Sequence, residues 1–460
     1  MLKQLFILFI ILILAGCTKY PQGNQREVSS IIATKIEGQA EWYGGPPDEQ
    51  IQASIYCLLA DVLTPEAAIQ IAFLKNPQVQ SIFEEVGIAH ADLVEAGLFT
   101  NPAFELEVRY PHVKNFKTNI EYLVTAAFLD ILLIPLRTRL ATVELEQAKR
   151  RVAHAILDLA FDVRQTYYEL VSMQQRHQYT LSMVELANLQ SEIILRQHMV
   201  GNINNLAFQQ AQASYLEAKL EIAKEQTAII RLREKLNRLM GLGEDVCLIL
   251  PKEIPPDVDY QGFDLCILEA VALSERLDLQ AARYEVVRLQ RMLGLKEGWT
   301  YTNLKAGLAG EREPDGLNVV GYGLAGEIPI FNFGQAAQMR LWAQLRQAQD
   351  RLTALEISIL SEVREAHQLL MCDLEMIRDY RVGILPLQTE ILKASEGLYN
   401  VMGLGIDRLL DNKHQQLEAN RNYLEILKDY WVARVQLDKA LGGYLFRLLP
   451  PDVSCNGGIE

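Results

Sequence analysis

One uninterrupted stretch of sequence decides the fold. Residues Leu136–Met199 read LRTRLATVELEQAKRRVAHAILDLAFDVRQTYYELVSMQQRHQYTLSMVELANLQSEIILRQHM and contain neither glycine nor proline. As a single α-helix rising about 1.5 Å per residue, this stretch would be about 95 Å long, which no globular core requires. Apolar residues recur at spacings of three and four, for example Val152, Ile156, Leu159 and Val163, with charged residues between them. This pattern is typical of helices that pack as coiled coils, so we predict a very long helix that lies against neighbouring helices.

The chain repeats itself with a shift of about 200 residues. Ile71–Phe73 aligns with Val271–Leu273, and Val163–Arg164 aligns with Val363–Arg364. Because the shift stays nearly constant along most of the chain, we predict two copies of one structural unit.

Each copy is expected to contain two short helices, a pair of strands and two long helices joined by a turn. In the first copy we predict short helices at 64–75 and 77–97, strands at 103–110 and 119–131, and long helices at 136–199 and 203–240. In the second copy we predict strands at 301–309 and 319–328 and long helices at 335–399 and 406–447, with local breaks at Gly383 and Pro386.

The predicted strands alternate between apolar and polar residues. One face of the first strand carries Phe104, Leu106, Val108 and Tyr110, and charged residues separate them. Strands of about 9–11 residues with one apolar face are typical of transmembrane sheets, although the edge of a soluble β-sandwich shows the same alternation. No apolar run reaches the roughly 20 residues of a transmembrane helix. Because four strands cannot close a barrel and open edges are not tolerated in lipid, membrane strands would require several copies to share one barrel.

The N-terminus resembles a bacterial lipoprotein signal. Lys3 is followed by the apolar run Leu5–Leu14 and then by Ala15-Gly16-Cys17. A run of this length is too short to span a bilayer but suits the apolar region of a signal peptide. On this interpretation Cys17 becomes the lipidated first residue of the mature chain, and Thr18 after it resembles the pattern of outer-membrane lipoproteins. The alternative is an ordinary signal peptide whose cleavage site happens to precede a cysteine.

Several kinds of chemistry find no support in the sequence. The formal net charge is −14, which argues against a nucleic-acid binder. The cysteines show no CxxC spacing and the histidines no HxxxH or HExxH spacing, so no metal site is predicted, and the pairing of Cys247 with Cys266 stays open. Gly321–Gly326 fits GxGxxG, but it lies inside a predicted strand rather than between a strand and a helix, so we predict no nucleotide site there.

Four local motifs, taken in their order and spacing, resemble the TolC family of outer-membrane efflux ducts. They are Leu63–Pro77, Ala96–Pro102, Gly201–Gln212 and Glu327–Gly334. The similarity covers roughly residues 60–447. Arg276-Leu277-Asp278 departs from it, since the family usually has a proline in the middle of this triplet.

The resemblance implies a fold class that is mainly α with a small β-barrel contribution. Each copy would supply two short helices, two strands and a long α-helical hairpin, and three chains would form a 12-strand β-barrel and an α-helical tunnel. The expected division is a signal peptide at 1–16, a lipid-anchored linker at 17–62, a first repeat at 63–243, a linker at 244–263, a second repeat at 264–447 and a C-terminal tail at 448–460.

The implied function is that of a passive exit duct of a tripartite efflux or export system, not an enzyme, and no cofactor is expected. The expected partners are two further copies in a homotrimer, a periplasmic adaptor (membrane fusion) protein, an inner-membrane pump and outer-membrane lipid, but no nucleic acid. The alternative is a lipid-anchored periplasmic coiled-coil adaptor without a pore, although such adaptors carry one helical hairpin rather than two. The cargo, whether drug, metal or protein, cannot be read from the sequence.

The two hairpin turns, Met199–Leu206 and Val401–Leu410, are the predicted docking sites for the adaptor. They would be the ends of the long helices farthest from the membrane, and Gly201 and Gly403 would allow a tight turn and the close approach of another backbone. The alternative is that both glycines serve the turns alone.

Asp407 and Asp411 are the predicted periplasmic gate. They are four residues apart and therefore share one face of a helix. The resemblance implies that aspartates just after this turn line a narrow mouth, where a trimer would gather three copies of each carboxylate and favour cations; Asp411 is the closer match. The alternative is two solvated acids at a helix start, stabilised by the helix dipole.

Overall fold

The computed structural model describes residues 25–38, 40, 42–43, 49–110, 112, 117–127, 130–243, 246, 248–256, 258, 260, 262–298, 304–326, 331 and 333–448. The predicted signal peptide, Cys17 and Cys247 lie outside these residues. The chain divides into two compact units, one made of Met1–Val28, Phe83–Val152 and Asp278–Ala354, the other of Ser29–Ile82, Ala153–Leu277 and Leu355–Glu460.

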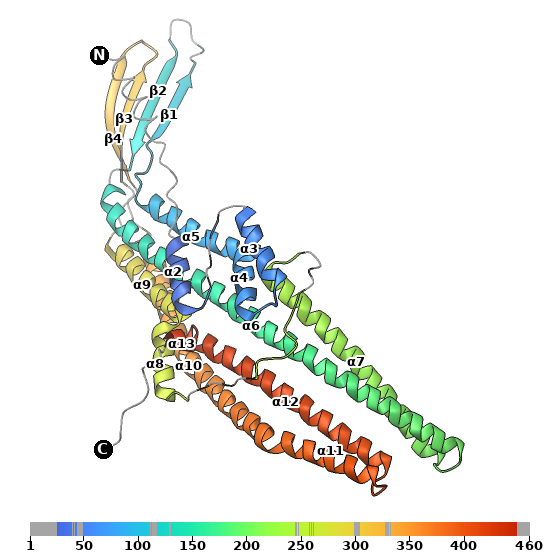
Figure 1. Ribbon diagram of the computed structural model, residues 1–460. Helices are drawn as coiled ribbons and strands as arrows, with labels where there is room; N and C mark the ends of the chain where they lie inside the picture. Colours follow the sequence, from blue (N-terminus) through green and yellow to red (C-terminus); the bar gives the residue numbers. More distant parts are fainter. Residues whose placement is uncertain are drawn as a thin grey trace, which may run out of the picture. The chain divides into compact units, whose positions relative to one another are not determined.

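The first unit contains one antiparallel sheet of four strands (Figure 1). The strands are β1 (Ala103–Arg109), β2 (Asn119–Ala126), β3 (Leu304–Arg312) and β4 (Asn318–Gly326), and they lie in chain order. The strand pair of each copy therefore joins the other pair through β2 and β3, where Val124 lies opposite Leu308. β2 stops at Ala126 instead of continuing to 131, and β3 extends to Arg312 instead of 309, while its predicted first residues, 301–303, lie outside the described residues.

The sheet has one apolar and one polar face, as the alternation predicts. The register places Leu106 opposite Tyr122 and Leu308 opposite Tyr322. The large apolar side chains exposed on this face come from all four strands: Phe104, Leu106, Val108, Tyr122, Val124, Leu304, Leu308, Val320, Tyr322 and Leu324. On the other face Arg109 pairs with Glu107 at 2.7 Å and with Glu121 at 3.5 Å. Gly321–Gly326, the GxGxxG match, lies within β4, which is not the setting of a nucleotide-binding loop.

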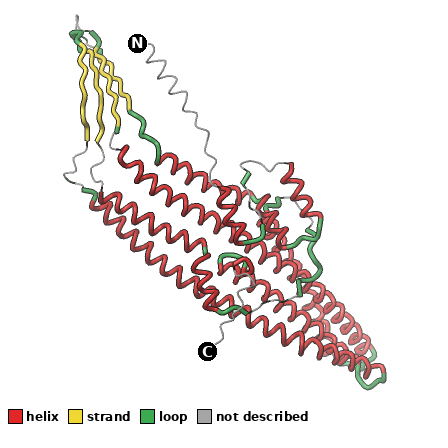
Figure 2. The backbone as a smooth tube through the Cα atoms, turned by 60° about the vertical axis from the view of Figure 1, so that its left-hand side comes forward, coloured by secondary structure: helices red, strands yellow, loops and turns green. Residues whose placement is uncertain are grey.

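The helices, drawn in red in Figure 2, repeat in the order that the duplication predicts. The first copy contains α4 (Pro65–Lys75), α5 (Pro77–Ala96), α6 (Asp130–Met199) and α7 (Asn205–Met240). The second copy contains α8 (Leu265–Glu275), α9 (Leu277–Gly298), α10 (Gln335–Asp379), the π-helical segment η1 (Tyr380–Ile384), α11 (Leu385–Asn400), α12 (Ile406–Leu441) and the short α13 (Leu445–Leu448). None of the helices described is long and apolar enough to cross a membrane.

Equivalent positions of the two copies make equivalent contacts in the second unit. Between α4 and α5, the Asn76 side-chain nitrogen donates to the Leu239 carbonyl oxygen at 2.8 Å. Between α8 and α9, Arg276 stands in the place of Asn76, and its Nη1 donates to the Ala440 carbonyl oxygen at 3.5 Å. The departure from the family pattern at 276–278 therefore preserves this helix-to-helix connection, and α9 still begins at Leu277.

The segment 17–62, expected as a linker, contains two helices, α2 (Gln25–Lys35) and α3 (Glu49–Ala60). Three apolar residues of this segment, Val28, Ile32 and Ile36, are fully buried, and their spacing of four is the helical signal that sequence reading passed over. Lys35 ion-pairs with Glu275, and the Lys35 carbonyl accepts a hydrogen bond from the Tyr444 N–H at 2.8 Å. This part of the segment is thus built into the helical core.

The long helix α6 starts six residues earlier than predicted and continues through Pro135. Its first residue, Asp130, accepts hydrogen bonds from Thr100 at 2.7 Å and from Arg137 at 2.8 Å. A carboxylate at a helix N-terminus is favoured by the helix dipole, so these contacts support a start at Asp130 ahead of the proline.

Candidate functional site: the turns of the long hairpins

The first hairpin turn connects α6 to α7 and is held by local contacts. The Asn204 side chain caps α7 by accepting a hydrogen bond from the Ala207 N–H at 2.9 Å. The His198 ring stacks on Phe208, with ring centroids 5.1 Å apart. Gly201 has a φ of +78°, a left-handed conformation that glycine adopts without steric cost.

The second hairpin turn, between α11 and α12, uses its glycine differently. The left-handed residue is Met402, with a φ of 60°, and Gly403 follows it with an ordinary backbone conformation. The Gly403 N–H donates to the Leu398 carbonyl oxygen at 2.8 Å, and a Cβ added at 403 would lie 3.4 Å from that oxygen. A residue other than glycine is uncommon in the left-handed conformation that Met402 adopts, because its side chain then carries a steric cost. The two turns are therefore not copies of each other in backbone geometry.

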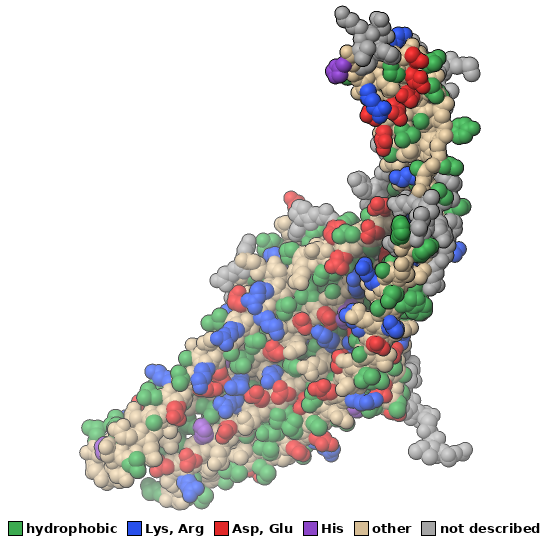
Figure 3. Space-filling view, turned by 180° about the vertical axis from the view of Figure 1, so that it is seen from behind, with side chains coloured by type: hydrophobic (Ala, Val, Ile, Leu, Met, Phe, Trp, Pro, Cys, Tyr) green, Lys and Arg blue, Asp and Glu red, His purple; other side chains and the backbone are tan. Residues whose placement is uncertain are grey.

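Both turns expose large apolar side chains. Met402 is 96% exposed, and four further apolar residues of the turns are more than half exposed: Met199, Val200, Leu206 and Val401. Exposed apolar residues gathered at one place mark surfaces that contact another molecule. Elsewhere on the face shown in Figure 3, acidic and basic side chains are interspersed over the helices.

Asp407 and Asp411 lie one turn apart at the start of α12, and both are exposed. Among the residues described, neither forms an ion pair. Their neighbour Asn412 is bonded to α11 instead, through Nδ2 to the Ser395 hydroxyl at 2.6 Å. The structure thus places two solvent-facing carboxylates together just after the second turn, as the spacing predicts.

A buried ionic cluster links the two hairpins, and sequence reading missed it. The Glu225 carboxylate on α7, with a side chain only 3% exposed, accepts hydrogen bonds from Arg176 Nε at 2.9 Å and from the Thr180 hydroxyl at 3.0 Å. Arg176, on α6, also donates through Nη1 to Glu425 of α12 at 2.8 Å. No spacing rule distinguishes Glu225 from the exposed acids of α7, so the sequence carries no signal for it.

A second buried cluster lies where α6, α12 and α13 meet. The Asp438 carboxylate accepts a hydrogen bond from the Leu445 N–H at 3.0 Å and lies 3.7 Å from Arg164 Nη1. The Arg164 guanidinium covers the Tyr444 ring at 4.5 Å. Burial raises the pKa of Tyr444 to about 12 and also raises the pKa of Asp438, against the lowering effect of Arg434 and Arg164. These groups hold the ends of long helices together.

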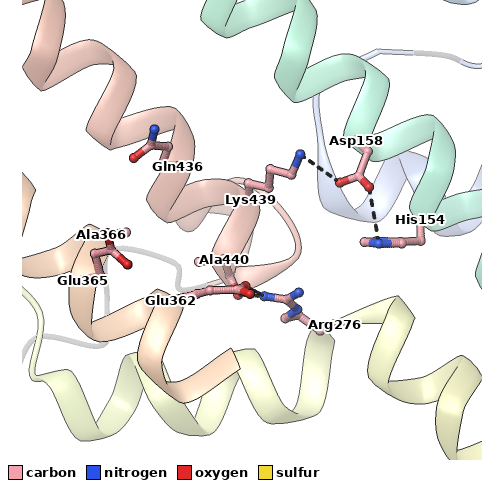
Figure 4. A pocket seen from close by; sticks show the side chains of 9 residues that line it. All are labelled: His154, Asp158, Arg276, Glu362, Glu365, Ala366, Gln436, Lys439 and Ala440. Atoms are coloured by element: carbon pink, nitrogen blue, oxygen red, sulfur yellow. Dashed lines mark hydrogen bonds and ion pairs between the residues drawn. The ribbon is translucent and has the colours of Figure 1, made fainter. Parts of the chain in front are cut away.

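A cavity of about 370 Å³ in the second unit is lined mainly by charged side chains (Figure 4). Lys439 lies 3.4 Å from Asp158, which lies 3.4 Å from His154, and Arg276 pairs with Glu362. The cationic side chains that line the cavity, Lys439 and Arg276, are therefore already paired with carboxylates of the protein. Over the described part of the chain, no group of three or more His, Cys, Asp or Glu side chains could hold a metal ion. Cys57, Cys266 and Cys372 are free and exposed.

Comparison with known proteins finds relatives over most of the chain. It is 22% identical over 404 residues to the cobalt-zinc-cadmium resistance protein CzcC of Cupriavidus metallidurans, covering 83% of this chain and 91% of CzcC. It is 24% identical over 315 residues to the probable outer membrane lipoprotein SilC of Salmonella typhimurium, covering 64% of this chain and 65% of SilC. No family model matches the chain.

Solved structures share the fold. The outer membrane channel MtrE of Neisseria gonorrhoeae superimposes with a TM-score of 0.63 at 15% identity, over 82% of this chain and 88% of MtrE. The duplicated hairpins, the four-stranded sheet and these likenesses show that the chain has the fold of TolC-type outer-membrane channels. The predicted resemblance to the TolC family and the predicted fold class, mainly α with a small sheet, are thereby confirmed.

Proposed function

We propose that this protein is the outer-membrane exit duct of a tripartite efflux system and works as a homotrimer with a periplasmic adaptor and an inner-membrane pump. The observation that carries the proposal is the two-copy architecture, in which two long hairpins accompany a sheet with one exposed apolar face. A coiled-coil adaptor, the alternative, has one hairpin and would have no need for that face. The relatives and solved structures support the duct over the adaptor.

The sheet edges support the trimer. Among the residues described, β1 and β4 each pair with a single strand, which leaves one edge of each without a hydrogen-bonding partner. In hydrocarbon each unsatisfied backbone group would cost several kcal/mol. Pairing β1 of one copy with β4 of the next satisfies both edges when the ring of copies closes. Mass measurement in mild detergent should give a trimer. A monomer that stays folded in detergent and conducts ions in a bilayer would contradict the proposal.

Lipidation of Cys17 belongs to the same proposal. The residue follows a signal of lipoprotein type, and the relative SilC is described as a probable outer membrane lipoprotein. Labelling with a radioactive fatty acid should tag the wild type and leave Cys17→Ser unlabelled. Equal labelling of both proteins would contradict the lipid anchor.

The hairpin turns are proposed as the adaptor contacts and the two aspartates as the cation-selective mouth. The support is the exposed apolar side chains at 199–206 and 401–410 and the two exposed carboxylates directly after the second turn. Gly403→Trp should abolish export while the trimer persists.

Asp411→Asn, alone or with Asp407→Asn, should lower cation selectivity in a planar bilayer. Glu418→Gln, another exposed acid farther along α12, is the matched control and should leave selectivity unchanged.

The proposed cargo is the divalent heavy-metal cations. The support is the likeness to CzcC, described as a cobalt-zinc-cadmium resistance protein, nine-tenths of which this chain covers. Such a duct needs no enzyme chemistry. Deleting its gene should lower the growth-inhibiting concentrations of zinc, cobalt and cadmium, with no change for an uncharged organic toxin. If the growth-inhibiting concentrations of the metals stayed unchanged while that of an organic toxin changed, the metal cargo would be contradicted, but the proposed duct function would not.

A further inference from the structure

The two long hairpins differ at one point of the helix that enters each turn. In the first copy α6 runs unbroken for 70 residues to its turn. In the second copy the corresponding helix is interrupted by η1, where the Leu385 N–H bonds to the Tyr380 carbonyl five residues earlier instead of four. Single π-helical turns inside α-helices occur frequently at functional sites, and sharp bends occur at them.

The sequence itself causes the interruption. Pro386 has no N–H to donate, and its ring would collide with the carbonyl of Val382 in a regular helix. Gly383 lies inside the π turn, and a Cβ added there would meet no atom within 4 Å. The π turn is therefore set by the proline, and among the described residues no atom lies close enough to Gly383 to oppose a side chain there.

Arg381 fastens the π turn to two other parts of the second unit. Its Nε donates to the Tyr423 hydroxyl of α12 at 2.8 Å, and its Nη2 donates to the Pro256 carbonyl of the segment between the two copies. The same guanidinium lies 6.0 Å from the centre of the Tyr423 ring. One side chain thus ties η1 both to the returning helix and to the inter-repeat segment.

The inter-repeat segment is a fixed support for this contact. The Trp431 indole N–H donates to the Pro255 carbonyl at 3.0 Å, and the Ile254 N–H donates to the Gln175 side-chain oxygen of α6 at 3.0 Å. Ile254 is buried, and the Trp431 ring stacks on Tyr168 at 4.9 Å. The Pro256 carbonyl is therefore held on α6 and α12, while η1 reaches it through Arg381.

On the turn side of η1, α11 and the start of α12 are joined. Asn412 bonds to Ser395, and Leu392 and Leu417 are buried. A bend at η1 would therefore carry α11, the second turn and both aspartates together, with α12 flexing near Tyr423.

We infer that Tyr380–Ile384 is a hinge for the end of the second hairpin and that Arg381 holds it in the conformation seen here. This inference rests on the proposed duct function, since the hinge would set the position of Asp407 and Asp411. Breaking the Arg381 contacts would free the end of the hairpin, and straightening η1 into an α-helix would remove the freedom to bend.

The test combines these two changes in the purified full-length protein. Arg381→Met keeps the length of the side chain and removes both hydrogen bonds, so it should raise the open probability in planar bilayers roughly tenfold. Adding Gly383→Ala and Pro386→Ala should suppress most of that rise. Gly397→Ala lies in α11, where an added Cβ also meets nothing within 4 Å. Added to Arg381→Met as the matched control, it should leave the rise in open probability unchanged. An unchanged open probability in Arg381→Met, or a rise that persists fully after straightening, would overturn the hinge.

Hydrogen exchange gives a readout that does not depend on conduction. Arg381→Met should speed amide exchange at 380–400 roughly tenfold and leave the corresponding part of α6 unchanged. Tyr423→Phe, which removes only the acceptor hydroxyl, should give a smaller increase in the same residues. A wild type that never conducts would refute the duct, whereas unchanged exchange in both variants would refute the hinge.

Discussion

The first and second long hairpins arise from the same repeated unit but are stabilised in different ways. The first has the unbroken helix α6, a capped and glycine-containing turn, and the buried Glu225 between α6 and α7. The second has a helix interrupted at η1, an uncapped turn with a left-handed Met402, and two exposed aspartates. The two copies therefore share one architecture but differ at the end of the long hairpin, where we propose that the second copy bends and meets ions.

The largest expected effect comes from removing the buried carboxylate of the first hairpin. Glu225→Ala leaves Arg176 without its buried partner, and breaking such a pair costs about 3 kcal/mol of unfolding free energy. Glu221, 36% exposed and 3.7 Å from Arg176, is the matched control, because exposed pairs contribute at most about 1 kcal/mol. Chemical unfolding of Glu225→Ala and Glu221→Ala compares them. Equal effects would show that the first hairpin does not depend on this cluster.

A smaller change in the unfolding free energy, opposite in sign, is expected when a carboxylate of the second hairpin, Asp373, is neutralised. Burial, together with the nearby Asp429, raises the pKa of Asp373 on α10 to about 6, against the lowering effect of Lys428. Because the folded pKa lies above the unfolded one, this group favours folding only while it is protonated. The contribution of Asp373 to the unfolding free energy should therefore fall as the pH rises from about 4 through about 6.

Asp373→Asn removes that pH dependence. It should raise the unfolding free energy by about 2 kcal/mol at pH 7.5 and change it little at pH 4. Unfolding curves at the two pH values measure this. A variant less stable than the wild type at pH 7.5 would mean that the charged carboxylate stabilises the helix instead.

Sequence reading anticipated the elements better than the contacts between them. The periodicity of 136–199, the proline and glycine at 383–386 and the strand alternation predicted α6, the break at η1 and the faces of the sheet, because each is a local property of the chain. Glu225, Arg381 and Asp438 could not be assigned, since their roles depend on partners far along the sequence. The second turn shows the same limit, because which residue becomes left-handed, Gly403 or Met402, is decided by how the helix end packs.

The smallest expected effects distinguish the two turns. Gly201→Ala forces a side chain into the left-handed conformation and should cost about 1 kcal/mol of stability. Met402→Gly relieves the same conformation in the second turn and should gain roughly 0.5–1 kcal/mol. Thermal unfolding of the two variants in detergent checks the pair. Changes of the same sign would contradict the backbone difference between the turns.

The central claim is that this chain forms a trimeric duct whose mouth carries the aspartates of the second hairpin. The most direct measurement is a planar-bilayer recording of the purified trimer, comparing wild type with the Asp407→Asn, Asp411→Asn double variant under a salt gradient. The account predicts a conducting, cation-selective wild type and a double variant that conducts with clearly reduced cation selectivity. A trimer that carries no current, or equal cation selectivity in both proteins, would contradict it.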